Sequence, residues 1–243
     1  MKLHAQIVRQ SRISEKDREN MIQLYRRYYD NVEESIFYAD LQRKSWVIWV
    51  KEDGDRLMGF SNIEIITLPV EGEKHKFLFS GDTIITEEAR YPALLSAAFI
   101  RFTDELLKSR ERTPVYWFLI TKGFRTYRFL PMYFNKYYPC IAEDFPVSEK
   151  IVLDTIARHK FGELYQSEKL IIPHTQTKDR LKAGHAMIPQ GRLQNPHVRF
   201  FADKNPGHTD GDELCCITRI SHENVTPLYY KTGRSGVSIS WVT

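Results

Sequence analysis

Hydrophobic and polar residues alternate in several short segments of the chain, which is the pattern of half-buried strands. The segment 3–7 begins the series, with apolar residues separated by polar neighbours. Segments 45–51 and 56–68 are rich in β-branched and aromatic residues, and Asp53 and Gly54 between them suit a tight turn, so we expect an antiparallel hairpin. Further strands are expected at 76–86, 114–121, 197–203 and 212–220.

Apolar residues at helical spacing predict helices between these strands. Segment 19–30 follows a capping pair formed by Ser14 and Asp17, and segment 33–44 reads as a second short helix. Segment 91–109 has few polar positions. Much of this longer helix is therefore expected to be buried.

The C-terminal half of the pattern is less regular. Segment 122–139 looks helical in its first part, but Pro131 is expected to bend or split the helix. Segment 148–162 predicts one further helix, and it is followed by a polar stretch of poor periodicity. The tail 231–243 has no clear place in the pattern, and no internal repeat is present.

Composition narrows the class of protein. The chain has 243 residues, of which 42% are apolar and 27% charged, enough for one large globular domain with a core of its own. The charge of +4 comes from mixed basic and acidic residues without a basic block, so we expect no nucleic-acid partner. Three cysteines offer no disulfide framework, and no apolar run reaches the roughly 18 residues of a membrane span. We expect a cytoplasmic protein.

The order of elements is one strand, two helices, a hairpin, a strand, a long helix, a strand, a helix and two strands. This order, with the segments 40–66, 77–90 and 114–124, resembles the GNAT (Gcn5-related N-acetyltransferase) superfamily of acyltransferases. The resemblance implies an α/β fold with a mixed, mostly antiparallel sheet. Its splayed central parallel strands are flanked by helices.

The resemblance also divides the chain. Residues 1–139 correspond to the core that binds the acyl donor. Residues 140–195 form a helical or irregular insertion expected to shape the acceptor site. Residues 196–243 supply the final strands that complete the sheet, and a polar tail.

In the superfamily, a thioester donor lies between the splayed strands, here 76–86 and 114–121, where its pantetheine arm takes the place of a strand. No tightly bound cofactor is expected, because the donor is a co-substrate. The resemblance assigns donor contacts to Ile84, Ile85, Thr86, Arg90, Lys122 and Arg125.

The loop that holds the donor's phosphates departs from the superfamily pattern. Ala93 and Leu95 stand where glycines normally let backbone amides approach a diphosphate, and Glu87 and Glu88 add negative charge. The donor is therefore interpreted as either acyl-coenzyme A or an acyl carrier protein. A fatty acyl chain in an aromatic tunnel would compensate by roughly 0.8 kcal/mol per buried methylene. Aromatic residues are dense in segment 116–138.

Transfer of the acyl group to an amine needs a base for the amine and an acid for the departing thiolate. Asp82 interrupts two apolar runs at the position where many members of the superfamily carry a basic carboxylate. Ser80 beside it is a candidate to hold the amine or a water. Tyr127 and Tyr133 are the candidate acids, with Tyr127 favoured because it lies closer in sequence to the strand end.

The acceptor is predicted to be a primary amine, such as a Lys or ornithine side chain of a peptide that becomes a lipopeptide. Two alternatives remain open: a noncatalytic module that binds acyl thioesters, and an enzyme like the acyl-homoserine-lactone synthases. No metal site is predicted, because the histidines of the C-terminal third lack ligand spacing.

Overall fold

The structure is a computed structural model that describes residues 2–89, 92–108, 113–176 and 178–243. Its strands are β1 (Leu3–Arg9), β2 (Tyr29–Asp30), β3 (Trp46–Glu52), β4 (Leu57–Val70), β5 (Glu73–Ile85), β6 (Val115–Thr121), β7 (Ile171–Ile172), β8 (Arg180–Leu181), β9 (Glu213–Arg219) and β10 (Ile239–Val242). Its α-helices are α1 (Glu15–Tyr28), α2 (Glu34–Arg43), α3 (Pro92–Leu107), α4 (Phe124–Tyr127), α5 (Phe129–Tyr133), α6 (Val147–Phe161), α7 (Ala183–Ala186), α8 (Pro196–Lys204) and α9 (Pro227–Gly233). Short 3-10 helices are η1 (Gln10–Arg12), η2 (Gly162–Leu164), η3 (Gln190–Gln194) and η4 (Pro206–Thr209).

One large sheet forms the centre of the molecule. Its strand order is β10-β1-β3-β4-β5-β6-β9-β7, while β2 and β8 pair separately. The pairs β10–β1 and β5–β6 are parallel, and the other neighbours are antiparallel. This confirms the predicted α/β class with a mixed, mostly antiparallel sheet and adjacent parallel strands at its centre.

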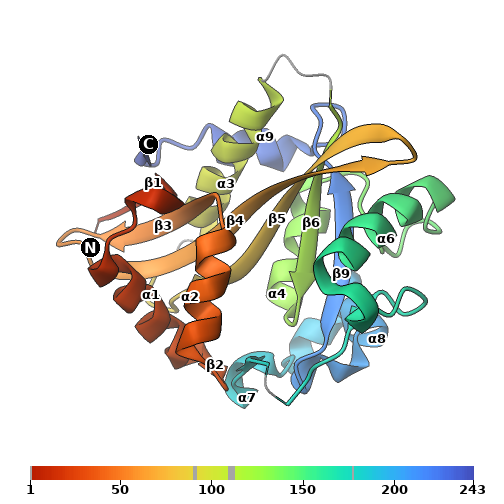
Figure 1. Ribbon diagram of the computed structural model, residues 1–243, viewed down its shortest axis with the longest axis horizontal. Helices are drawn as coiled ribbons and strands as arrows, with labels where there is room; N and C mark the ends of the chain where they lie inside the picture. The colour runs from red at the N-terminus through yellow and green to blue at the C-terminus, as the bar shows by residue number, and fades with distance from the viewer. Residues whose placement is uncertain (1, 90–91, 109–112, 177) are drawn as a thin grey trace.

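Helices cover both faces of the sheet. The helices α1, α2 and α6 lie on one face, and α3 and α9 lie on the other (Figure 1). The capping box that starts α1 is present, with the Asp17 amide donating to Ser14 Oγ at 3.2 Å. Its apolar stripe packs with α2 on side chains of β3 and β4, forming a second cluster beside the main core.

The two central parallel strands separate before they end. Their pairing stops at Ser80 and Leu119. Beyond this point β5 continues along β4 to Ile85, and β6 continues along β9 to Thr121. The separation thus begins five residues before the end of β5, and it leaves one edge of each strand without a strand partner.

One expectation for the C-terminal half was wrong. Segment 197–203 was expected as a strand but forms α8, because Asn195 caps its start and Pro196 occupies the first turn. Its apolar residues Val198 and Phe201 are buried at helical spacing of three. The tail, which had no assigned place, supplies the end of α9 and strand β10, which pairs with β1.

The segment after β6 is split as predicted. It forms two short helices, α4 and α5, with Arg128 between them and Pro131 inside the second. Pro131 lacks a backbone N–H and its ring crowds the carbonyl four residues earlier, at Tyr127, so a continuous helix is disfavoured.

Candidate functional site

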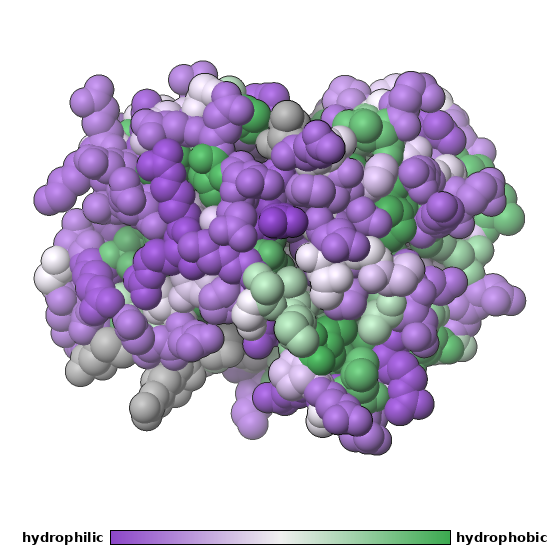
Figure 2. Space-filling view, turned by 90° about the horizontal axis from the view of Figure 1, so that it is seen from below, coloured by the Kyte–Doolittle hydropathy of each residue, from purple (hydrophilic) through white to green (hydrophobic). Residues whose placement is uncertain are grey.

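The gap between β5 and β6 opens into a large cavity of about 1230 Å³. Its walls come from both faces of the sheet: α2 and the end of α6 on one face, and α3, α5 and α9 on the other. Figure 2 views the molecule from the end where β2 and α7 lie. Polar side chains cover most of the half that belongs to α1 and α2, and apolar side chains gather mainly in the other half.

A β-bulge at the gap determines how Asp82 is placed. The register of β5 against β4 shifts by one residue between Gly81 and Ile84, so that Asp82 and Thr83 together stand opposite Ser61. Asp82 has a φ of 43°, a left-handed conformation that is unusual for a residue other than glycine. The extra residue turns the carboxylate of Asp82 toward α1, while Thr83 Oγ1 meets Ser61 Oγ at 2.8 Å.

The carboxylate of Asp82 is held by two neutral side chains. Tyr25 Oη donates to Oδ1 at 3.1 Å, and Asn62 Nδ2 donates to Oδ2 at 3.1 Å. Burial raises the pKa of Asp82 to about 6, and the charge of Asp40 adds to this effect while that of Lys44 opposes it. Asp82 therefore exchanges its proton near neutral pH.

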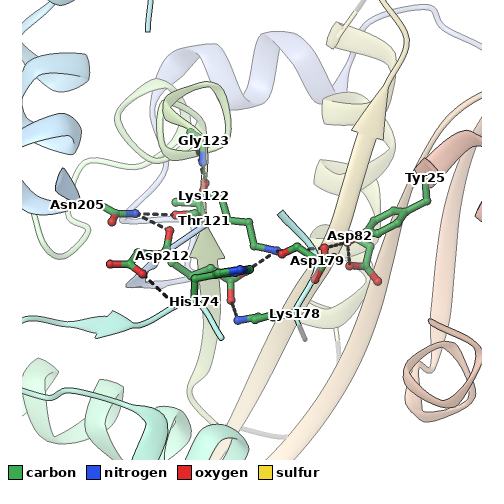
Figure 3. Close-up of polar contacts among 11 residues, drawn as sticks. Tyr25, Asp82, Thr121, Lys122, Gly123, His174, Lys178, Asp179, Asn205 and Asp212 are labelled. Atoms are coloured by element: carbon green, nitrogen blue, oxygen red, sulfur yellow. Dashed lines mark hydrogen bonds and ion pairs between the residues drawn. The ribbon is translucent and has the colours of Figure 1, made fainter. Parts of the chain in front are cut away.

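Tyr25 lies between two carboxylates. Its hydroxyl contacts both Asp82 and Asp179 but carries only one proton, so it donates to one of them at a time (Figure 3). Burial and the two carboxylates raise the pKa of Tyr25 well above its ordinary value, which keeps the proton on the phenol. Donation to Asp179 leaves Asp82 as the group that takes up a proton.

Asp179 is the more acidic of the two carboxyls. Burial alone would raise its pKa, but the ammonium of Lys122 and the hydrogen bonds from Tyr25 and Lys122 outweigh burial and lower it. Lys122 Nζ donates to the backbone oxygen of Asp179 at 3.0 Å and lies 3.1 Å from its Oδ2. Asp179 thus stays ionised while Asp82 titrates.

Two networks of paired charges flank Asp82. In the first, Lys44 Nζ lies 2.8 Å from Asp40, and Lys160 Nζ lies 2.6 Å from Glu64. The second links Lys122 to Asp179 and Glu213, and Glu213 also pairs with Lys178 (Figure 3).

The lysines of these networks, and Arg43 beside Asp40, are paired with the four other carboxylates, so Asp82 is left without an ion-pair partner among the described residues. This half of the cavity therefore favours a single positive charge close to Asp82.

The other face of the gap carries different chemistry. Ser80 Oγ accepts a hydrogen bond from Trp117 Nε1 at 2.8 Å, which turns Ser80 toward α3. A small pocket of about 40 Å³ lies there beside the main cavity, and Ser80 and Tyr133 line both. Tyr133 is largely buried, and its hydroxyl makes no hydrogen bond to any of the described residues. Of the two candidate acids, Tyr133 is the one that lines the cavity.

Tyr127, the favoured acid in the sequence, lies elsewhere. It is fully buried, and its hydroxyl donates to Pro139 O at 2.9 Å. Its ring packs against Phe200 and Phe201 of α8 rather than against the cavity. Tyr127 and Tyr133 are six residues apart, so even in one continuous helix they would face different directions. The geometry therefore favours Tyr133 over Tyr127.

The expected donor contacts lie at different places around the gap. Ile84 and Ile85 line the cavity. The amide of Thr86 donates to Met58 O at 2.8 Å on the β4 side; because backbone groups alternate along a strand, those of Ile85 point into the gap. Gly59 lets β4 and β5 approach closely here, since a Cβ at that position would lie 2.7 Å from Ile84 O.

The other residues expected to contact the donor differ in whether their side chains line the cavity. Thr86 is buried outside the cavity, where its Oγ1 accepts the amide hydrogen of Ala89. Lys122 lines the cavity but is committed to the second charge network, and Arg125 lines it with an exposed side chain. Arg90 lies outside the described residues.

Sequence reasoning missed several residues that the structure brings to Asp82. Tyr25 belongs to segment 19–30, where only the helical spacing is visible, and Asp179 lies in the polar stretch of poor periodicity. Asn62 and Lys44 belong to segments read only as strand and helix. No local pattern marks these side chains, because they meet Asp82 only through tertiary structure.

Other kinds of site find no support in the described part of the chain. No group of three or more His, Cys, Asp or Glu side chains there is arranged to hold a metal ion. None of its helices is both long and apolar enough to cross a bilayer.

No protein-family model matches the chain, and no curated protein matches it. Similar solved structures include a conserved protein of unknown function from Enterococcus faecalis V583, a probable N-acyltransferase, with a TM-score of 0.43 and 11% identity over 91% of this chain and 66% of that one. YhbS of Escherichia coli, a GNAT family N-acetyltransferase in complex with CoA, matches with a TM-score of 0.36 and 17% identity over 52% of this chain and 66% of that one. NAA60 of Arabidopsis thaliana, in complex with a bisubstrate analogue, matches with a TM-score of 0.37 and 14% identity over 54% of this chain and 87% of that one.

This chain thus spans just under two thirds, 66%, of the length of the first two structures. With TM-scores below 0.5, none of the three assigns a role to a residue of this chain. Function is therefore inferred from the cavity itself.

Proposed function

We propose that this protein is an N-acyltransferase of the GNAT type, which moves an acyl group from a thioester to a primary amine. The observation that carries the proposal is the titratable carboxylate of Asp82, held by a bulge at the point where two parallel strands separate. A gap between strands offers unpaired backbone groups to an extended pantetheine arm, and Asp82 supplies a base beside it.

The reaction requires the acceptor to be an uncharged amine. An ammonium enters the cavity beside ionised Asp82 and gives a proton to this carboxylate, directly or through a water. The free amine then attacks the thioester carbonyl, forming a C–N bond, and the tetrahedral intermediate collapses with cleavage of the C–S bond. The hydroxyl of Tyr133 protonates the thiolate that leaves. The second proton of the attacking nitrogen passes through water to the tyrosinate and restores the phenol, so the products are an amide and a free thiol.

The donor is proposed to lie along Ile84 and Ile85, with the backbone groups of Ile85 bonded to the pantetheine arm. Ser80 lies at the last paired position of β5, close to where the thioester carbonyl would sit. Both coenzyme A and an acyl carrier protein present the same arm, so the gap accepts either.

We further propose that the acyl group is a long chain. The main support is the volume of the cavity, about 1230 Å³, which exceeds the space that a pantetheine arm and a small amine fill. The aromatic residues of 116–138 give less support than the sequence indicated. Tyr116, Phe118 and Tyr138 are core residues, whereas Phe129 and Tyr133 line the cavity.

The acceptor is proposed to bind on the α2 side. The inserted segment 140–195 contributes Lys178 and Asp179 to that wall, and α2 contributes the exposed side chain of Ile36. This combination of a carboxylate centre and an open rim suits an amine on a flexible side chain, such as a lysine or ornithine of a peptide.

The test offers the protein acetyl, octanoyl and decanoyl thioesters of coenzyme A and of a carrier protein, together with a lysine-containing peptide and a simple alkylamine. Amide formation is followed by mass spectrometry and thiol release by absorbance. We expect both products in equal amounts with at least one donor and acceptor. Binding of a thioester without amide formation across the panel would instead identify a noncatalytic module.

A further inference from the structure

The cationic side chains that line the cavity fall into two kinds. The four lysines near Asp82, and Arg43 of α2, are each paired with a carboxylate, at distances up to 3.6 Å. Three arginines at the α4 end of the cavity have no carboxylate partner among the described residues: Arg125, Arg128 and Arg192. Unpaired guanidinium groups beside a cavity are the donors that bind phosphate oxygens best.

Two of these arginines share one side of a helix. Arg128 keeps helical dihedral angles, with φ of −62° and ψ of −18°, so it follows Arg125 by three residues on the same side of α4. Arg125 uses one of its five N–H groups on the backbone oxygen of His185, at 3.3 Å. Arg192 approaches the cavity from η3, so cations from two separate elements line this end.

The acidic loop after β5 repels a phosphate at this end of the cavity less than its sequence implied. Glu88 is turned away to Arg56, at 2.7 Å, and to Arg27, at 3.9 Å, which compensates its charge. Glu87 remains as an exposed carboxylate on the cavity wall. Positive charge therefore exceeds negative charge at this end of the cavity.

We propose that Arg125 and Arg128, together with Arg192 of η3, form the site for the phosphate group that ends the donor's pantetheine arm. This rests on the proposed function, because it assumes a donor in the gap. The guanidinium groups take over from the missing glycines at positions 93 and 95, since side-chain donors reach a phosphate that backbone amides cannot approach. The ligand chemistry is a phosphate ester, present both in coenzyme A and in the prosthetic arm of a carrier protein.

Titration calorimetry tests the site without any acyl transfer, using coenzyme A, phosphate-free pantetheine and a holo carrier protein as probes. We expect the wild-type protein to bind coenzyme A about tenfold or more tightly than pantetheine, with a preference that falls as salt is raised. The double variant Arg125→Gln with Arg128→Gln should lose this preference. Thermal unfolding of the double variant checks that it remains folded.

Arg43→Gln is the matched control, because Arg43 lines the same cavity but is already paired with Asp40 at 2.7 Å. It should keep the full preference for coenzyme A. The probe whose binding depends more strongly on the two arginines, coenzyme A or the carrier protein, is the source of the phosphate. Equal affinity of the wild-type protein for coenzyme A and pantetheine, or an unchanged preference in the double variant, would overturn the proposal.

A thioester of N-acetylcysteamine, which has no phosphate, separates this inference from the proposed function. Turnover of that thioester without any phosphate preference would remove only the arginine site. Arginine-dependent binding of coenzyme A without turnover of any thioester would keep the site and remove the acyltransferase.

Discussion

The two halves of the cavity treat charge in opposite ways. Around Asp82, the cationic side chains pair with other carboxylates and leave Asp82, the group that titrates, without an ion-pair partner among the described residues. At the α4 end, arginines line the wall without carboxylate partners among the described residues. The paired half can set the pKa of a base because its charges are fixed by one another, whereas the unpaired half has charge available for a ligand.

The largest expected effect concerns the titrating group. Asp82→Asn should lower turnover by about 10²-fold or more, because the amide cannot accept a proton from the amine. Single-turnover measurements with saturating thioester isolate this step. Turnover within a factor of about three of the wild-type value would show that Asp82 is not the base.

The same variant should not lose stability, which distinguishes a chemical defect from misfolding. The folded-state pKa of Asp82 lies above its unfolded value, so this residue's contribution to stability is greatest at low pH and is lost as pH rises through about 6. At pH 8 the ionised carboxylate opposes folding. We expect the free energy of unfolding of the Asn variant to exceed that of the wild type by about 1–2 kcal/mol at pH 8, a value discounted for the partial exposure of the side chain. Below about pH 4 the two free energies should be equal.

A smaller effect is expected on the other face of the gap. Tyr133→Phe should lower turnover about 10- to 100-fold by removing the proposed acid, while leaving the affinity for the thioester nearly unchanged. Tyr127→Phe is the comparison, because it removes a buried hydrogen bond to Pro139 and no cavity contact. It should lower stability by about 1 kcal/mol with turnover largely retained. The reverse pattern would reassign the acid to Tyr127.

The smallest effect is a shift in pH dependence. Turnover should rise with pH through about 6, because burial raises the pKa of Asp82 to about 6 and the carboxylate ionises in this range. Asp179→Asn removes a charge that raises the pKa of Asp82, so the midpoint should fall by about half a unit to one unit. Lys44→Met removes a charge that lowers this pKa, so it should move the midpoint upward. Shifts in the same direction for both variants would contradict the electrostatic account.

Much of the fold could be predicted because its pattern is local. Residues close together in the chain determine the strands of the hairpin, the capping box of α1 and the break near Pro131. Segment 197–203 shows where this fails, because a short run with Val198 and Phe201 three apart fits either a strand or a helix until the Asn195 cap is recognised.

The candidate site was only partly predictable. The polar residues Ser80 to Asp82 interrupt an apolar strand, and this local irregularity identified Asp82. Tyr25 and Asp179 are 154 positions apart in the chain, and nothing in either segment announces that they meet. The choice between Tyr127 and Tyr133 depended on helix direction, which sequence distance from the strand end does not reveal.

The cavity reaches solvent on both faces of the sheet, since exposed Ile36 of α2 and exposed Leu228 of α9 both line it. In the proposed reaction the two substrates would therefore enter by separate routes, and neither would have to leave before the other arrives. For steady-state kinetics we expect a ternary complex. Double-reciprocal plots at several fixed concentrations of the second substrate should intersect instead of running parallel, and a dead-end analogue of one substrate should not block entry of the other.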